Sequence, residues 1–284
     1  MRRLVVPLLV TLAACTASGD ATTIPVTASS TSTAVATTGS GGGIGLPPCL
    51  TGEAPFRADG ILGTSGRDRA DAVTVADIRL DEYAPSGGLG SGCERVTIVL
   101  ATATGAPATA VARVSAEVLG ESAVVRLFLP AELTGTAVAN IVFEGTFVDR
   151  VYVVNGGSEA FIDVHLASPA LARFTTTASP ARLVVDVRSG DRDSQRRPTV
   201  TDSVVIVEPG AGDETYPFTV RGYARSSLPV LPVVVHGAGD EVATIGTVTG
   251  APHAWRPFEI DVSTGPGGVV RLQVGEALVP LVMP

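Results

Sequence analysis

The feature that most limits the fold is the lack of helical periodicity. Beyond the N-terminal apolar segment, no 12-residue window keeps a 3.6-residue period free of Gly and Pro. Short valine-rich runs instead recur between Gly, Pro and Asp breaks from Val73 onward, which is typical of strands and turns. The nearest helical candidate is 108–119, where β-branched residues favour a strand over the alternative helix. We therefore expect an all-β protein.

Alternation within the runs predicts which side chains enter a core, because neighbouring residues of a strand point to opposite faces. Asn155 and Gly156 predict a hairpin between two of the runs. The residues expected to face inward form three apolar triplets: Val96, Ile98 and Leu100; Ile162, Val164 and Leu166; Leu183, Val185 and Val187. Seven further runs suit an immunoglobulin-like sandwich: 204–207, 218–222, 230–236, 242–248, 258–262, 269–274 and 278–282.

Composition excludes several classes of function. The 284 residues include 20 Lys+Arg, all of them arginine, so mechanisms that need a lysine are excluded. The net charge of −8 argues against a nucleic-acid partner, which needs a cationic surface. A hydrophobic fraction of 45 % with 17 % charged residues excludes disorder over most of the length.

The N-terminus carries an export signal. Residues 1–3 are basic at positions 2 and 3, and 4–14 is apolar apart from Thr11, too short to span a bilayer. The string Leu-Ala-Ala-Cys at 12–15 resembles the bacterial lipobox. That resemblance implies lipidation of Cys15, cleavage after Ala14 and an extracytoplasmic protein held to the cell membrane by lipid. The alternative is an ordinary secretory signal with an incidental cysteine.

A low-complexity stretch follows Cys15. Thirteen of the 25 residues in 16–40 are Ser or Thr, and glycines and prolines continue to residue 48. This composition cannot bury a core and predicts a flexible stalk of roughly 30 Å r.m.s. reach. The expected organisation is a signal peptide at 1–14, a lipidated stalk at 15–48, a sandwich at 49–190, a linker at 191–198 and a second sandwich at 199–284.

Assigning Cys15 to lipid leaves Cys49 and Cys93 as an even pair in an oxidising compartment. We expect a disulfide between them, the alternative being two unrelated thiols. Closing a loop of about 45 residues would stabilise the fold by roughly 4 kcal/mol. The bond would hold the weakly patterned segment 50–72 against the first strands.

Three strings of the first domain resemble AMIN-like domains: 93–100 (Cys-Glu-Arg-Val-Thr-Ile-Val-Leu), 143–147 (Phe-Glu-Gly-Thr-Phe) and 180–187 (Pro-Ala-Arg-Leu-Val-Val-Asp-Val). The opening has Glu94-Arg95 where the family has Asp-Arg. The resemblance implies a non-catalytic β-sandwich of exported bacterial proteins that attaches to cell-wall components.

The second domain is similar to the Gmad immunoglobulin-like domain of spore-germination proteins. Three strings carry the similarity: 207–209 (Val-Glu-Pro), 218–225 (Phe-Thr-Val-Arg-Gly-Tyr-Ala-Arg) and 254–258 (Ala-Trp-Arg-Pro-Phe). No antibody-type Cys pair is present, so Trp255, Phe258, Ile260 and Val262 are expected to hold its two sheets together. The polar linker between the domains is expected to be a solvated hinge.

Catalytic patterns are missing from the sequence. The histidines lack metal-ligand spacing, no serine sits in G-x-S-x-G, and no helix start follows the glycine-rich stretches. We therefore expect no enzyme activity, no metal and no cofactor. The favoured function is binding of peptidoglycan or another wall glycan through the AMIN-like domain. The alternatives are a protein–protein scaffold or adaptor on the outer face of the cell membrane and an unrecognised envelope enzyme.

Alternation also predicts a ligand-binding face. If the strands at 159–166 and 181–188 share one sheet, their outward side chains would together offer an aromatic ring, guanidinium groups and hydrogen-bond acceptors, which suits a sugar with acidic peptides. The alternative is that Arg182 and Asp186 form solvated cross-strand pairs. The candidate ligand-binding residues are Phe161, Asp163, His165, Arg182, Asp186 and Arg188.

Overall fold

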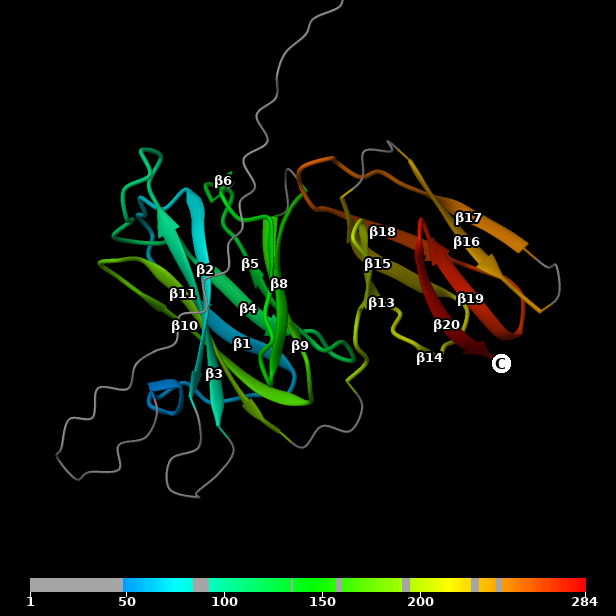
Figure 1. Cartoon of the computed structure of the whole chain (residues 1–284), viewed down its shortest axis with the longest axis horizontal. Helices are drawn as coiled ribbons and strands as arrows, with labels where there is room; N and C mark the ends of the chain where they lie inside the picture. The colour runs from blue at the N-terminus through cyan, green and yellow to red at the C-terminus, as the bar shows by residue number, and fades with distance from the viewer. Residues whose placement is uncertain are drawn as a thin grey trace, which may run out of the picture. The chain divides into compact units, whose positions relative to one another are not determined.

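The structure is a computed structural model that describes residues 48–83, 92–133, 135–156, 160–190, 195–225, 230–238 and 242–284. The predicted signal peptide, Cys15, the stalk up to residue 47 and linker residues 191–194 lie outside these ranges. Within them the chain is nearly all β, with strands β1 to β20, a 3₁₀ turn η1 (Pro48–Leu50) and no α-helix (Figure 1). No helix in the described ranges is long and apolar enough to cross a membrane.

The first sandwich consists of two sheets with β-strands in the orders β1-β4-β5-β9-β8-β7 and β10-β11-β3-β2-β6. All its pairings are antiparallel except that of β2 with β6. The first sheet contains β1 (Gly60–Ser65), β4 (Val114–Val118), β5 (Val124–Phe128), β9 (Ala160–Leu166), β8 (Val148–Asn155) and β7 (Asn140–Val142). The second contains β10 (Ala170–Thr177), β11 (Arg182–Ser189), β3 (Cys93–Ala101), β2 (Thr74–Tyr83) and β6 (Gly135–Thr136).

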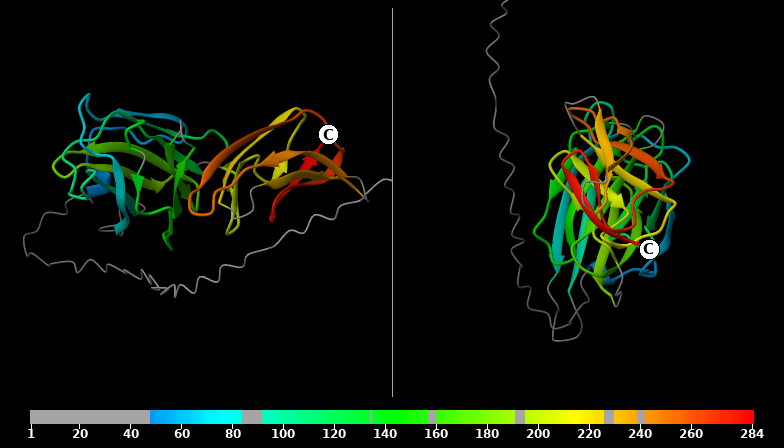
Figure 2. Two further views of the ribbon diagram at one scale, coloured as in Figure 1. Left: turned by 90° about the horizontal axis from the view of Figure 1, so that it is seen from above. Right: turned by 90° about the vertical axis from the view of Figure 1, so that its right-hand side faces the viewer.

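The second sandwich, coloured yellow to red in Figure 2, has sheets in the orders β12-β13-β15-β18 and β14-β20-β19-β16-β17. All its pairings are antiparallel except that of β14 with β20. The first of these sheets contains β12 (Thr199–Val200), β13 (Val204–Glu208), β15 (Phe218–Ala224) and β18 (Arg256–Val262). The second contains β14 (Gly212–Asp213), β20 (Ala277–Met283), β19 (Gly268–Val274), β16 (Leu231–His236) and β17 (Val242–Val248). All seven predicted runs are strands.

Alternating apolar residues build the cores as the sequence predicts. All three apolar triplets of β3, β9 and β11 lie in the core of the first sandwich, each side chain at most 2 % exposed. The segment 108–119 contains the strand β4 rather than a helix, which confirms the preference for β structure. Asn155 of β8 pairs with Ala160 of β9, which confirms the hairpin.

The predicted disulfide between Cys49 and Cys93 is present, with 6.2 Å between the Cα atoms. It joins η1 to the first residue of β3, so the start of the described chain is fixed to the sheet of the first sandwich. Both cysteines are almost fully buried. The segment after η1 then leads to β1, an element that the weak pattern at 50–72 did not predict.

A third buried cluster joins the two sandwiches. Its members come from both: Val124, Tyr152, Val154 and Phe161 from the first, and Val205, Val207, Tyr223 and Trp255 from the second. Trp255 was expected in the core of its own sandwich, and that expectation is wrong. It is 2 % exposed and packs edge-on against Tyr152, with 4.9 Å between the ring centroids. Phe258, Ile260 and Val262 do pack on the second core.

The end of the linker is bonded to the first sandwich. The backbone N–H of Arg196 donates to the carbonyl of Glu121 (2.7 Å), and the carbonyl of Arg196 accepts from Ala123 (2.9 Å). Residues 195–198 are therefore not the solvated hinge that their polarity predicted. Together with the third buried cluster, these bonds fix the segment through which the chain enters the second sandwich.

Candidate functional site

The six predicted ligand-binding residues do not form one face. Strand β9 belongs to one sheet of the first sandwich and β11 to the other, so the condition on which the predicted site depended is not met. Phe161, Asp163 and His165 are at most 5 % exposed, although they do point away from the core as alternation predicted. The reason is that the second sandwich covers the outer face of β9.

On β9, Asp163 forms a bidentate ion pair with Arg126 of the neighbouring strand β5. The Arg126 Nε donates to Oδ1 (2.8 Å) and Nη2 to Oδ2 (2.7 Å), and Asp163 is fully buried. The Arg126 guanidinium also lies 4.0 Å from the centroid of the Phe161 ring. Burial raises the pKa of Asp163, and the charge of Arg126 opposes that rise. Both groups are occupied, so neither is free to bind a ligand.

His165 joins β9 to the second sandwich through Tyr223 of β15. The His165 Nε2 and the Tyr223 hydroxyl share a hydrogen bond of 2.5 Å. Burial, with a smaller effect from the positive charges of Arg150 and Arg126, lowers the pKa of His165 to about 3, so its imidazole is neutral. Burial also raises the pKa of Tyr223 well above its usual value, so the phenol keeps its proton. This hydrogen bond therefore helps to hold the two sandwiches together.

On β11, Asp186 lies at the centre of a three-strand ladder. It is directly opposite Arg173 of β10 on one side and Arg95 of β3 on the other. Its carboxylate accepts from Arg95 Nε (2.6 Å) and from Arg173 Nε (2.9 Å), and Asp186 is 1 % exposed. Asp186 therefore pairs with Arg95 and Arg173, and the predicted alternative of a solvated pair between Arg182 and Asp186 is wrong. Arg182, the first residue of β11, is exposed.

The two arginines of the ladder also hold the segment that follows the predicted stalk. Arg95 Nη2 donates to the carbonyl of Pro48 (2.8 Å). Arg173 Nη2 donates to the carbonyls of Cys49 (3.1 Å) and Thr51. With the disulfide, these bonds form what we call the N-terminal clamp: residues 48–57 fixed on β3 and β10. The Nε and Nη2 groups of both arginines are thus bonded within the protein, to Asp186 and to the N-terminal segment.

Phe56 completes the clamp. Its ring lies 4.8 Å from the guanidinium carbon of Arg173 and 4.5 Å from that of Arg188. The next residue, Arg57, exchanges two backbone hydrogen bonds with Ala172 of β10 (2.8 and 2.9 Å). Arg188 is thus a stacking partner of the N-terminal segment. Nothing in the local sequence around Phe56 predicted this, because the contact joins residues more than a hundred positions apart.

Glu94 connects two of the three strings of the first domain that resemble AMIN-like domains. Its buried carboxylate accepts from the backbone N–H groups of Thr146 (2.5 Å), Phe147 (3.0 Å) and Val148 (2.8 Å). Burial raises the pKa of Glu94, and these hydrogen bonds oppose the rise. The string at 93–100 is therefore bonded to that at 143–147 through Glu94, and to that at 180–187 through the Arg95–Asp186 pair. Both links are structural.

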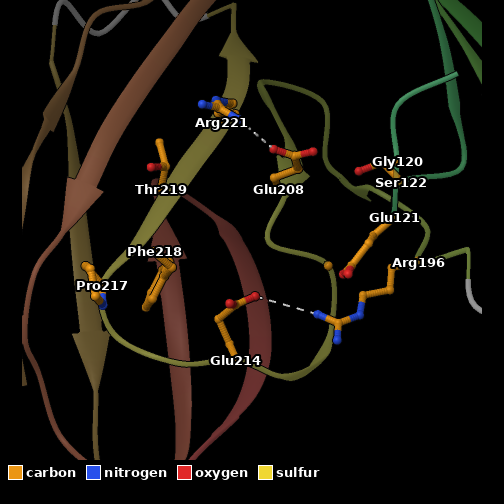
Figure 3. Close-up of a pocket in the computed structure, with 11 residues that line it drawn as sticks. Gly120, Glu121, Ser122, Arg196, Glu208, Glu214, Pro217, Phe218, Thr219 and Arg221 are labelled. Atoms are coloured by element: carbon orange, nitrogen blue, oxygen red, sulfur yellow. Dashed lines mark hydrogen bonds and ion pairs between the residues drawn. The ribbon is translucent and has the colours of Figure 1, made fainter. Parts of the chain in front are cut away.

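A polar cleft of about 480 Å³ lies beside the junction of the sandwiches (Figure 3). It is lined by Glu121 of the turn between β4 and β5, by Arg196, and by Glu208, Glu214 and Arg221 of the second sandwich. Two ion pairs join these side chains: Arg221 with Glu208 (3.2 Å) and Arg196 with Glu214 (3.6 Å).

Glu121 is the exposed acid of the cleft and points into it beside Arg196. The cleft therefore presents both carboxylate and guanidinium groups at a partly solvated surface, where they can exchange partners at small cost. It suits a polar ligand that carries charges of both signs. The sequence did not single out these residues, because they come from four separate segments.

No group of three or more His, Cys, Asp or Glu side chains in the described part of the chain is arranged to hold a metal ion. Comparison with known proteins identifies no relative: no family model, curated protein or solved structure matches this chain.

Proposed function

We propose that this chain is a lipid-anchored, non-catalytic protein of the bacterial cell envelope that binds peptidoglycan or another wall component. The observation that carries the anchoring is the string Leu-Ala-Ala-Cys at 12–15, which follows an apolar segment too short to span a bilayer. After removal of Arg2 and Arg3 the chain keeps 18 positive and 28 negative charges, so attraction to anionic lipid cannot hold it at a membrane.

The disulfide and the N-terminal clamp support export and tethering. A buried disulfide persists in oxidising compartments outside the cytoplasm. The clamp fixes the chain to two strands, β3 and β10, immediately after the residues proposed as a stalk. A domain held by a lipid at the far end of such a stalk is pulled at this point, and the clamp spreads the load over a disulfide and several hydrogen bonds.

Wall binding is supported by the resemblance to AMIN-like domains and by the chemistry of the cleft in Figure 3. The peptide stems of peptidoglycan carry carboxylates together with amines. The cleft offers Glu121 to an amine and Arg196 or Arg221 to a carboxylate. We assign the ligand to this cleft, since the six residues first expected to bind it do not form one face. Three of them lie under the second sandwich, Asp186 and Arg188 contact the ladder and the N-terminal clamp, and Arg182 alone of the six is exposed.

Anchoring is tested by cell fractionation of Cys15→Ala, with Thr16→Ala as the matched control. The Cys15 variant should leave the membrane fraction or accumulate as the uncleaved precursor, and the control should behave as wild type. A Cys15→Ala chain of mature size that still fractionates with membranes contradicts the anchor.

Wall binding is tested by co-sedimentation with purified sacculi. Glu121→Gln combined with Arg221→Gln should lower retention severalfold without a large change in Tm, because both side chains are at the surface. Arg79→Gln, which removes an exposed arginine of β2, is the matched control. If wild type does not co-sediment, the wall-binding proposal fails and the scaffold alternative takes its place.

A further inference from the structure

The two outer faces of the second sandwich differ in chemistry. In an antiparallel sandwich the outward side chains are ordinarily polar, because they meet water. The sheet that contains β15 and β18 follows this rule: Thr219 bonds Asp261 (2.8 Å) and Arg221 bonds Glu259 (3.2 Å) on its surface. The sheet that contains β19 and β20 departs from it. The outward side chains of β20 are exposed and all apolar: Leu278, Pro280 and Val282.

Strand β19 continues this surface and adds a charge to it. Its pairing with β20 is regular from end to end, so Val269 lies directly opposite Val282 and Arg271 directly opposite Pro280. Val269 is 70 % exposed and Val282 is 47 % exposed. Contiguous exposed apolar side chains are typical of interaction sites. We call the outward side chains of the two strands the β19–β20 face: Val269, Arg271, Gln273, Leu278, Pro280 and Val282.

Arg271 lies at the centre of this face, is exposed, and forms no ion pair or hydrogen bond with any described residue. On its other side it is directly opposite His236 of β16. The His236 Nε2 donates to the Oε1 of Gln273 (2.7 Å), and the Gln273 Nε2 donates to the carbonyl of Gly275 (2.8 Å). Arg271, His236, Gln273 and Leu278 line a cleft of about 520 Å³. The cleft therefore presents a guanidinium group without a described partner, beside apolar side chains.

We infer that the β19–β20 face docks an extended segment of another protein, one that carries a carboxylate between two aliphatic side chains. Charge complementarity selects the carboxylate, because a guanidinium group binds it through two parallel hydrogen bonds. The net charge of −8 disfavours a second copy of this chain as the occupant. The inference goes beyond the proposed wall binding and does not depend on it.

The spacing of the face specifies the sequence of that segment. Side chains on one face of a strand repeat every two residues, or about 6.8 Å, and an extended partner segment has the same repeat. An acidic side chain over Arg271 then has one neighbour over the Val269–Val282 pair and the other over Leu278. The expected pattern in the partner is aliphatic, any residue, acidic, any residue, aliphatic.

A glycan or a membrane fits this face less well. Sugar hydroxyls placed over Val269, Val282 and Leu278 would lose water without gaining hydrogen bonds. An anionic membrane attracts clusters of basic residues, whereas Arg271 is the one arginine of the β19–β20 face.

The test is fluorescence anisotropy with the purified mature chain in detergent and two labelled peptides. The first peptide, Thr-Val-Thr-Glu-Thr-Val-Thr, carries the expected pattern, and the second has Gln in place of Glu. The acidic peptide should bind at least about tenfold more tightly, since hydrogen bonds to charged groups are the stronger ones. Arg271→Gln should abolish this difference. Arg256→Gln, which removes an exposed arginine from the other sheet of the same sandwich, is the matched control and should preserve it.

Val269→Thr tests the apolar part of the face, because it keeps the shape of an exposed side chain and adds a hydroxyl. It should weaken the binding of both peptides severalfold. Equal binding of the two peptides, binding of neither, or an Arg271→Gln chain that still distinguishes them overturns the inference. Sedimentation with anionic vesicles that Arg271→Gln abolishes would assign the face to lipid and overturns it as well. Failure of wall binding is seen separately, in the sacculus assay of the Glu121 and Arg221 variants.

Discussion

The Arg126–Asp163 pair permits a quantitative test of how firmly the two sandwiches are joined. Its side chains are 16 % and 0 % exposed, and the pair lies under the second sandwich. Arg126→Met keeps much of the apolar length of the side chain but leaves the Asp163 carboxylate buried without a counter-charge. Removing one member of a buried pair costs about 3–5 kcal/mol. For a protein of this size, that lowers Tm by roughly 6–20 °C.

The loss should depend on pH. Burial already raises the pKa of Asp163, and without Arg126 the pKa in the folded state rises further above that of the unfolded chain. The folded variant therefore binds a proton more readily than the unfolded chain does. Stability is lost as pH rises through the pKa of the folded state, so the deficit is largest at neutral pH and smaller in mild acid.

The assay is urea unfolding followed by the fluorescence of Trp255, which is buried at the same junction. Arg79→Met is the matched control: its pair with Asp77 is 68 % and 42 % exposed, and its loss should cost less than about 1 kcal/mol. Adding Asp163→Leu to Arg126→Met should recover most of the stability, because the unpaired charge is gone. If Arg126→Met costs no more than the control at neutral pH, water reaches Asp163 and the junction is open.

Three further predictions follow from other buried groups. Replacing Cys49 and Cys93 by serine should lower the unfolding free energy by up to about 4 kcal/mol, measured by urea unfolding. Burial lowers the pKa of His165 from an ordinary 6.5 to about 3, so the unfolded chain takes up the proton first; stability should fall as pH drops through this interval, and His165→Gln should reduce that slope. Cutting within the stalk and within 189–198 should yield fragments of roughly 15 and 9 kDa that still co-elute in native gel filtration, since the shared cluster holds them.

Each of these has a result that would contradict it. Equal stability of the oxidised and cysteine-free proteins would mean that the ladder of Asp186 alone holds the N-terminal segment. An unchanged pH slope in the His165 variant would assign the acid sensitivity to other groups. Fragments that separate after cleavage would show that the shared cluster does not hold the sandwiches together.

Local sequence was sufficient to predict the strands with strong alternation. The triplets of β3, β9 and β11 point into the core because side-chain direction in a strand repeats every two residues, whatever surrounds it. The strand β10 escaped prediction because its inward residues include Ala170 and Ala172, which are too small to give a clear pattern. Pairing of Cys49 with Cys93 was predictable because the lipobox resemblance left two cysteines to pair.

Tertiary structure decided the candidate sites. Alternation correctly directed Asp163 and His165 away from the core, but it carries no information about what packs on the other face, and there the second sandwich lies. In the same way, Asp186 became the centre of a ladder only when β10 and β3 were placed on either side of β11. Alternation is a property of one strand, whereas burial and ion pairing depend on which strands and domains become its neighbours.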